Sequence, residues 1–224
     1  MNCSRESALT ASRIDHTLLR PEATKEDILK LCQEALENDF GAVFVHPCRA
    51  PLAVATLAST SVRVGSVAGF PFGANQTKLK IIEAEALVAE GVDEIDMVMN
   101  IGWLMDGELQ RVEEDIRGVR AALGNEIVLK VIIESAVLPV ALKRQAAQLV
   151  VAAEADFVKT STGLHPAGGA TLEDVTLLKE VVGEQIKVKA AGGIRNATQA
   201  LQMIQAGADR IGTSSGVEII KGLP

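Results

Sequence analysis

Tyrosine is absent from this 224-residue sequence, tryptophan occurs once, and aromatic residues make up only 3% of the chain. A chain this poor in aromatic side chains offers few platforms on which nucleic-acid bases could stack. The net charge is −7, and no block of Lys or Arg interrupts the acidic background. These absences argue against nucleic acid as the main partner, but a local basic pocket could still hold a small anion.

Cysteine is also scarce. Cys3, Cys32 and Cys48 form neither a CxxC pair nor a cluster with metal-ligand spacing, and the three histidines lie far apart. We therefore expect no disulfide framework, no metal site and no cofactor. The first residues lack the apolar core of a signal peptide, and no apolar run is long enough to cross a bilayer. We expect a cytoplasmic protein without a membrane partner.

Hydrophobic residues make up 48% of the sequence and charged residues 23%, as in ordinary globular proteins with a sizeable core. The length suits one large domain or two small ones. No Pro/Gly/Ser-rich linker divides the chain. We therefore expect a single domain over residues 1–224.

A strand followed by a helix recurs along the chain at a period of roughly thirty residues. The joints at 38–42, 89–93 and 205–209 look alike, because each places a glycine just past a helix and then enters a strand. The expected strands are 14–18, 42–46, 63–68, 94–99, 127–133, 157–159, 186–190 and 210–213. The expected helices are 4–10, 24–38, 51–57, 77–90, 108–123, 140–153, 172–182 and a last one that Asn196 caps and that runs to Ala206.

The strands are apolar along most of their length, which indicates cover on both faces of the sheet. Eight such units in one domain fit an α/β fold of the closed (β/α)8 TIM-barrel type, here with a short N-terminal helix. A doubly wound open sheet is the alternative, but no GxGxxG motif opens the first unit.

In a barrel the active site lies at the carboxyl ends of the strands. Five titratable side chains stand on four consecutive strands near those ends: Asp96, Lys130, Glu134, Lys159 and Lys189. A lysine near the end of a buried strand is costly unless it is paired or used. Desolvation frees its amine as a nucleophile toward carbonyl groups, so we predict that Lys159 forms a Schiff base.

One strand-end lysine alone is more often simply solvated, with its stem packed and its head in water. With five titratable side chains near the same strand ends, that explanation would have to hold separately for each of them, so a shared functional site is favoured. Lys189 is expected to depress the pKa of Lys159, and Asp96 to accept and return a proton. Lys130 either pairs with Asp96 and holds it ionised or forms a structural salt bridge.

Two glycine-containing loops follow the last two strands. They are 191–195, with Gly192, Gly193 and Arg195, and 212–216, with Gly212, Ser214 and Ser215. Backbone N–H groups before a helix bind phosphate, and barrels commonly place phosphate at this point. Gly163, which follows Thr162, is expected to complete this phosphate site.

The segments IDHTLL at 14–19, GFPFG at 69–73, EIDMV at 94–98, LKVIIE at 129–134, KTSTG at 159–163, GGIR at 192–195 and GTSS at 212–215 resemble deoxyribose-phosphate aldolases. The match runs in the same order over nearly the whole chain. It implies a class I aldolase of deoxynucleotide catabolism, needing no metal, that cleaves 2-deoxy-D-ribose 5-phosphate to D-glyceraldehyde 3-phosphate and acetaldehyde. It also implies that Lys159 is the Schiff-base lysine, Lys189 its partner and Asp96 the proton carrier, with Asp15 and Thr17 near the sugar. A homodimer is the expected assembly.

The sequence departs from the family in places. Phe44 and His46 stand where Cys and Asn are frequent, so the range of accepted substrates is open. Some members use a C-terminal tyrosine in proton transfer, a residue that this sequence lacks. The alternatives are a barrel isomerase that uses Asp96 or Glu134 without a covalent step, and a phosphosugar-binding barrel without activity.

Overall fold

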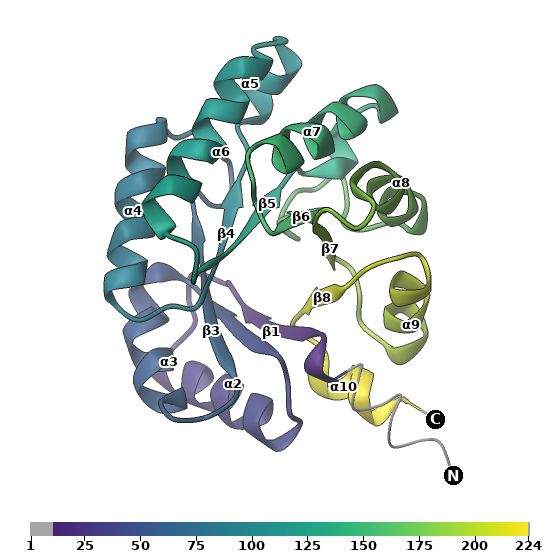
Figure 1. Ribbon diagram of the computed structural model, residues 1–224. Helices are drawn as coiled ribbons and strands as arrows, with labels where there is room; N and C mark the ends of the chain where they lie inside the picture. Colours follow the sequence, from purple (N-terminus) through teal and green to yellow (C-terminus); the bar gives the residue numbers. More distant parts are fainter. Residues whose placement is uncertain (1–10, 224) are drawn as a thin grey trace.

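The computed structural model describes residues 11–223, in which eight parallel strands close into a barrel with helices around the outside (Figure 1). Each strand pairs with its neighbours in sequence, and β1 pairs with both β2 and β8, which closes the ring. The strands are β1 (Ile14–Leu18), β2 (Ala42–Val45), β3 (Arg63–Ala68), β4 (Glu94–Val98), β5 (Val128–Ile132), β6 (Phe157–Lys159), β7 (Lys187–Ala191) and β8 (Arg210–Thr213). The expected TIM barrel is confirmed.

Seven helices connect consecutive strands around the outside of the barrel. They are α2 (Lys25–Glu37), α3 (Ala50–Leu57), α4 (Thr77–Ala89), α6 (Leu109–Leu123), α7 (Val140–Ala152), α8 (Leu172–Val182) and α9 (Ala197–Gln205). Their ends lie within two residues of the predicted ones. The short helices α5 (Ile101–Met105) and α10 (Gly216–Lys221) and the 3-10 turns Pro47–Arg49 and Ser135–Val137 were not predicted. The leading helix predicted at 4–10 lies outside the described residues.

Local sequence explains where several helices begin and end. Thr24 and Asp27 form a capping box at the start of α2, and the Asn196 side chain accepts a hydrogen bond from the Gln199 amide at the start of α9. Gly91 and Gly207 follow their helices with positive φ, as predicted. At the first joint the prediction was wrong, because the left-handed residue is Asp39 and not Gly41.

The apolar core lies between the barrel and the helices, and alternate strand residues such as Val43, Ile95, Leu129, Val158 and Val188 form its inner layer. The other set of strand residues points to the barrel axis, where branched apolar side chains usually dominate. Here that interior is charged, because it contains buried Asp15, Glu94, Asp96, Lys130 and Lys189. Both faces of the strands are therefore covered, as predicted, but charged side chains line part of the inner face.

Phe44 is a large apolar side chain in this charged interior, and it is almost fully buried. The amines of Lys189 and Lys130 lie 3.7 Å and 4.4 Å from its ring centroid. Gly65 on β3 makes room for the ring, since a Cβ atom there would sit 2.3 Å from it. The aromatic face therefore contacts two lysine ammonium groups, an arrangement that stabilises cations.

Candidate active site

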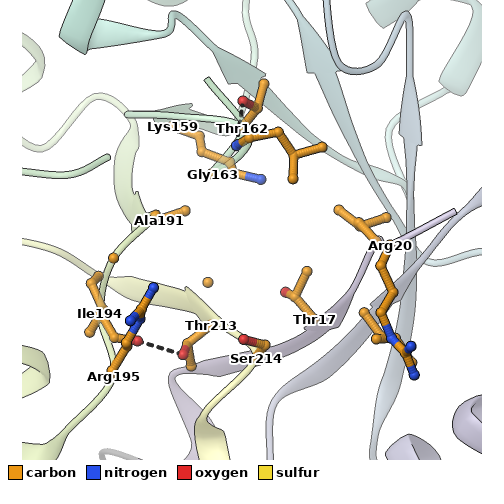
Figure 2. Close-up of a pocket in the computed structure, with 16 residues that line it drawn as sticks. Thr17, Arg20, Lys159, Thr162, Gly163, Ala191, Ile194, Arg195, Thr213 and Ser214 are labelled. Atoms are coloured by element: carbon orange, nitrogen blue, oxygen red, sulfur yellow. Dashed lines mark hydrogen bonds between the residues drawn. The ribbon is translucent and has the colours of Figure 1, made fainter. Parts of the chain in front are cut away.

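A pocket of about 310 Å³ opens at the carboxyl ends of the strands, where the sequence places the chemistry (Figure 2). Eight of the predicted site residues line it: Thr17, Lys159, Gly163, Gly192, Gly193, Arg195, Gly212 and Ser214. The amine of Lys159 faces the open centre of the pocket (Figure 2). Asp15, Asp96, Lys130, Glu134, Lys189 and Ser215 are not among the lining residues.

Beneath the pocket, Asp96 joins two lysines. The amines of Lys159 and Lys189 each donate a hydrogen bond of 2.7 Å to the same Asp96 oxygen, Oδ2. All three side chains are buried, and Lys159 alone reaches the cavity. The barrel brings them together because β4, β6 and β7 direct these residues inward from different sides of the axis.

The electrostatics of this cluster favour proton exchange. Burial alone would raise the pKa of Asp96, but the ammonium groups of Lys159, Lys189 and Lys130 hold it far below its usual range. Burial lowers the pKa of Lys189 to about 8, with Asp15 and Asp96 opposing the shift. Asp96 is thus ionised, and Lys189 can gain or lose a proton close to neutral pH.

Lys130 has a different principal partner from the one expected. Its amine forms a very short contact with Glu94 Oε2, and it lies 3.4 Å from Asp96 Oδ1 and 3.7 Å from Asp15 Oδ2. Both alternatives for Lys130 therefore hold in part, since it approaches Asp96 while its main pair is a buried salt bridge. Burial would lower the pKa of Lys130, but Glu94, Asp96 and Asp15 raise it.

Asp15 lies below the pocket and not at its wall. Its Oδ2 atom is 2.6 Å from the Lys189 amine, and its Oδ1 atom accepts hydrogen bonds from Arg210. The side chain is fully buried, so it contacts the lysine cluster and not the cavity. That Asp15 lies near the bound sugar stays a prediction. Thr17, two residues on along β1, does line the pocket.

Glu134 holds the loop that follows β6. Its carboxylate accepts hydrogen bonds from the backbone N–H of Thr162 at 3.2 Å and from the Thr162 hydroxyl at 2.6 Å. Glu134 itself adopts a left-handed conformation with φ of 50°. Because both oxygens face Thr162, the carboxylate fixes the pocket wall next to Lys159.

The predicted phosphate loops form the opposite wall (Figure 2). Gly192 and Gly193 both have positive φ. Gly192 lies so close to Gly163 and Gly169 that a Cβ atom on it would approach their Cα atoms to 3.2 Å and 2.9 Å. The Thr213 hydroxyl donates to the carbonyl of Ile194 at 2.7 Å, which ties the loop after β7 to the end of β8.

Other residues of the site were missed from the sequence. Thr162 and Arg20 line the pocket, although the Arg20 guanidinium points away from its centre (Figure 2) and pairs with Asp27 at 2.7 Å. Glu94 and Arg210 lie deeper in the interior. They stand at the first residues of β4 and β8, whereas the barrel rule points only to the carboxyl ends of the strands.

Among residues 11–223, no group of three His, Cys, Asp or Glu side chains is arranged to hold a metal ion. Within the same residues, no helix combines the length and the apolar character needed to span a membrane.

Comparison with known proteins gives consistent results. Residues 9–222 match the model of the DeoC/LacD family aldolase. A deoxyribose-phosphate aldolase of Thermococcus gammatolerans is 53% identical over 95% of each chain, and one of Desulfitobacterium hafniense is 50% identical over 94% of this chain and 96% of its own. The solved tetrameric deoxyribose phosphate aldolase from Aeropyrum pernix superposes with a TM-score of 0.89 at 33% identity, covering 96% of this chain and 91% of its own.

Proposed function

Because the chain belongs to the DeoC/LacD aldolase family, we propose that this aldolase acts through an imine on Lys159. Its reaction is the reversible cleavage of 2-deoxy-D-ribose 5-phosphate to D-glyceraldehyde 3-phosphate and acetaldehyde, the activity for which its relatives are named. The observation that carries the residue assignment is the shared Asp96 oxygen, to which Lys159 and Lys189 both donate directly beneath the pocket.

The reaction begins with the neutral amine of Lys159, which attacks the C1 aldehyde carbon of the open-chain sugar. The carbinolamine loses water and becomes an iminium cation. A base then removes the C3 hydroxyl proton, the C3 carbonyl forms, and the C2–C3 bonding electrons move toward the iminium nitrogen. Glyceraldehyde 3-phosphate leaves an enamine on Lys159, which is protonated at C2 and hydrolysed to acetaldehyde and free lysine.

Asp96 and Lys189 form the proton relay for these steps. A group with a pKa of about 8 can both give and take a proton near neutral pH, which suits Lys189. Asp96 lies between the two amines, and its Oδ1 atom has no hydrogen-bond partner. Because the Lys130 amine lies 3.4 Å from this Oδ1 atom and Asp96 does not line the cavity, the relay reaches the substrate through Oδ2 and the Lys159 amine.

The loops that follow β6, β7 and β8 suit the phosphate of the sugar. We assign phosphate binding to the backbone around Gly163, Gly192, Gly193 and Gly212, to Ser214 and Ser215, and to the cation of Arg195, with Thr17 beside the sugar. Backbone N–H groups in left-handed turns form concave sites for anions. Glu134 supports this end through Thr162, while Asp15 and Lys130 support the lysine cluster from below.

Trapping the imine tests the assignment. Sodium borohydride added with acetaldehyde should reduce the imine to an ethyl group on Lys159, which intact mass and peptide mapping would locate. The Lys159→Leu variant should fold, form no adduct and lose turnover by several orders of magnitude. Lys187→Leu is the matched control, because Lys187 lies on the next strand at the exposed opposite end of the barrel.

Turnover without any adduct in folded protein would instead favour the non-covalent isomerase chemistry. An adduct on another lysine would remove Lys159 from its role. Absence of both adduct and turnover would favour a barrel that only binds the sugar.

We also propose that the protein works as a single domain in the cytoplasm, in deoxynucleotide catabolism, and as a homodimer. The continuous barrel from β1 to β8 supports one domain. Phe72, Leu79 and Ile82, on α4 and the loop before it, are 80%, 48% and 58% exposed and offer an apolar surface to a second copy. Light scattering of the purified protein would test the dimer, and a monomeric mass would contradict it.

A further inference from the structure

Arg210 and Glu94 lie at the inner end of the charged barrel interior, away from the pocket. Arg210 donates to Asp15 Oδ1 through Nε at 2.8 Å and through Nη2, and its Nη2 atom is 3.6 Å from Glu94 Oε2. Glu94 is fully buried, and the Arg210 side chain is only 13% exposed. Neither residue lines the cavity, so neither can touch the substrate.

The contacts form a continuous chain from these two residues to the reacting amines. Arg210 bonds to Asp15, Asp15 lies 2.6 Å from the Lys189 amine, and Lys189 donates to the same Asp96 oxygen as Lys159. Glu94 joins from the other side, through its short contact with Lys130, which lies 3.4 Å from Asp96. A charge altered at Arg210 or Glu94 is therefore felt at the lysines through buried neighbours, where solvent screens little.

The barrel interior contains more basic than acidic side chains. Among the described residues, the connected buried cluster contains three carboxylates, Asp15, Glu94 and Asp96, and four basic side chains, Lys130, Lys159, Lys189 and Arg210. With every base protonated, the cluster carries one excess positive charge in a region of low dielectric constant. Arginine does not lose its proton in proteins, so the excess is relieved when one lysine becomes neutral.

We propose that Arg210 and Glu94 are positioning residues that set, by their opposite charges, how many protons the Lys159–Lys189 pair holds. The inference rests on the proposed function, because it explains how one amine of the pair becomes neutral for the attack on the aldehyde. Arg210 supplies the permanent charge that displaces a proton. Glu94 limits this effect and keeps Lys130 charged.

Several charged groups face Lys189 from the surrounding elements. The direction in which each group changes the pKa of Lys189 supports the proposal. Burial lowers the pKa of Lys189 to about 8, Asp15 and Asp96 oppose the shift, and Lys159 and Lys130 add to it. Arg210 acts on Lys189 through Asp15, whose pKa it helps to hold low. The charged side chains around the cluster are Asp15 on β1, Arg63 on β3, Glu94 and Asp96 on β4, Lys130 on β5, Lys159 on β6 and Arg210 on β8.

Two variants with opposite expected signs test the proposal, and the measurement is the pH dependence of kcat/KM with 2-deoxy-D-ribose 5-phosphate. Arg210→Gln removes the excess charge, so the lysines keep their protons to higher pH. The acid limb of the kcat/KM profile, in which activity rises with pH, therefore moves to higher pH by about one unit. Glu94→Gln adds to the excess, so the acid limb moves down by about the same amount. The double variant restores an excess of one, and its acid limb should return close to that of the wild type.

Arg63→Gln is the matched control. Arg63 also bonds to Glu94, at 3.1 Å, but its side chain is 54% exposed and has no contact with Asp15. Water screens such a charge, so its removal should leave the acid limb within about 0.2 pH units of the wild type. Circular dichroism and thermal melting would establish that each variant is folded. If Arg210→Gln alone fails to fold, the acid-limb shifts of Glu94→Gln and of the double variant still test the proposed role of the two residues.

Unchanged pH profiles, or acid limbs that move in the same direction in both single variants, would overturn the proposal. General damage to the barrel would not move the acid limb in opposite directions in the two variants. Borohydride trapping of acetaldehyde on the wild type separates this result from failure of the proposed function. Normal trapping on Lys159 with unshifted variants overturns only the role of Arg210 and Glu94. Missing trapping in the wild type overturns the covalent mechanism itself.

Discussion

Lys189 shares Asp96 with the lysine that faces the pocket, yet it has no surface on the pocket itself. Its contacts are Asp96, Asp15 and the ring of Phe44, whose centroid lies 3.7 Å from the amine. A buried cation held by two carboxylates and an aromatic face is well fixed in place. Its contribution to the reaction is therefore charge and a proton, delivered through Asp96.

Replacing Lys189 by leucine removes both contributions. We expect kcat/KM to fall by about 100-fold or more, the usual contribution of a proton-transferring side chain. The acid limb of the remaining activity should move to higher pH, because a positive charge next to Asp96 is gone. The pH–rate profile between pH 5 and 10 measures both effects. A profile that keeps its shape and position would exclude Lys189 from proton transfer.

At the scale of elements, the loop between β7 and α9 depends on close backbone packing. Gly192 has φ of 91°, which L side chains rarely adopt, and its carbonyl accepts a hydrogen bond from the Ala170 amide at 3.1 Å. A Cβ atom on Gly169 would come within 2.2 Å of that carbonyl oxygen. The loops carrying Gly163, Gly169 and Gly192 therefore form one packed unit, which leaves little freedom to the proposed phosphate wall.

Gly192→Ala should weaken binding of the phosphate and leave the chemistry at Lys159 in place. We expect KM for 2-deoxy-D-ribose 5-phosphate to rise roughly tenfold, as for the loss of one hydrogen bond to a charged group. Activity on unphosphorylated 2-deoxy-D-ribose should change little. Steady-state kinetics with both sugars measure how much the variant loses on the phosphorylated sugar relative to the unphosphorylated one.

Gly124→Ala controls for backbone strain in that experiment. Gly124 also has positive φ, but it lies at the end of α6, and no neighbouring atom comes within 4 Å of a Cβ built on it. Equal losses on both sugars in Gly192→Ala would show that the loop supports the fold in general and not phosphate binding.

Much of the element scale could be predicted from the sequence, because periodicity and glycine stops depend on local residues. The ends of β1, β3, β6 and β8 agree with the prediction. Helix α5 was missed because it has only five residues and lies inside a loop. The convergence of Asp96, Lys159 and Lys189 followed from the barrel rule alone, since that rule fixes which strand ends meet.

The inner layer could not be predicted in the same way. Which side chains meet across the axis depends on the stagger of the strands, and a sequence does not state it. Lys189 is level with Arg210 on β8, and Asp96 with Lys130 on β5. Without that register, neither Glu94 nor Arg210 was recognised as part of the interior cluster.

At the scale of the whole molecule, a charged interior links folding to pH. Burial would raise the pKa of Asp15, but Lys189, Arg210 and Lys130 lower it to about 2 from its ordinary value of 3.8. Ionised Asp15 therefore stabilises the folded state above pH 3.8, and this contribution is lost as the pH falls through about 2. The pKa of Asp96 is lowered as well, so the two carboxylates act in the same direction.

We expect the melting temperature to fall steeply between pH 4 and pH 2. Thermal melts followed by circular dichroism at intervals of half a pH unit measure the slope. In Asp15→Asn, which cannot ionise, the slope over this range should be shallower, whatever the melting temperature at pH 7. Equal slopes in the two proteins would contradict a stabilising role of the Asp15 charge.

The arrangement of the interior charges along the chain has one more consequence. The buried carboxylates Asp15, Glu94 and Asp96 all come from β1 and β4, whereas the basic partners Lys130, Lys159, Lys189 and Arg210 all come from β5 to β8. The barrel thus consists of an anionic first half and a cationic second half, joined by the connection between β4 and β5 that contains α5 and α6. Neither half can neutralise its own interior, so each half-barrel is electrostatically incomplete until the other docks onto it, and the Asp96–Lys159 contact forms only across that junction.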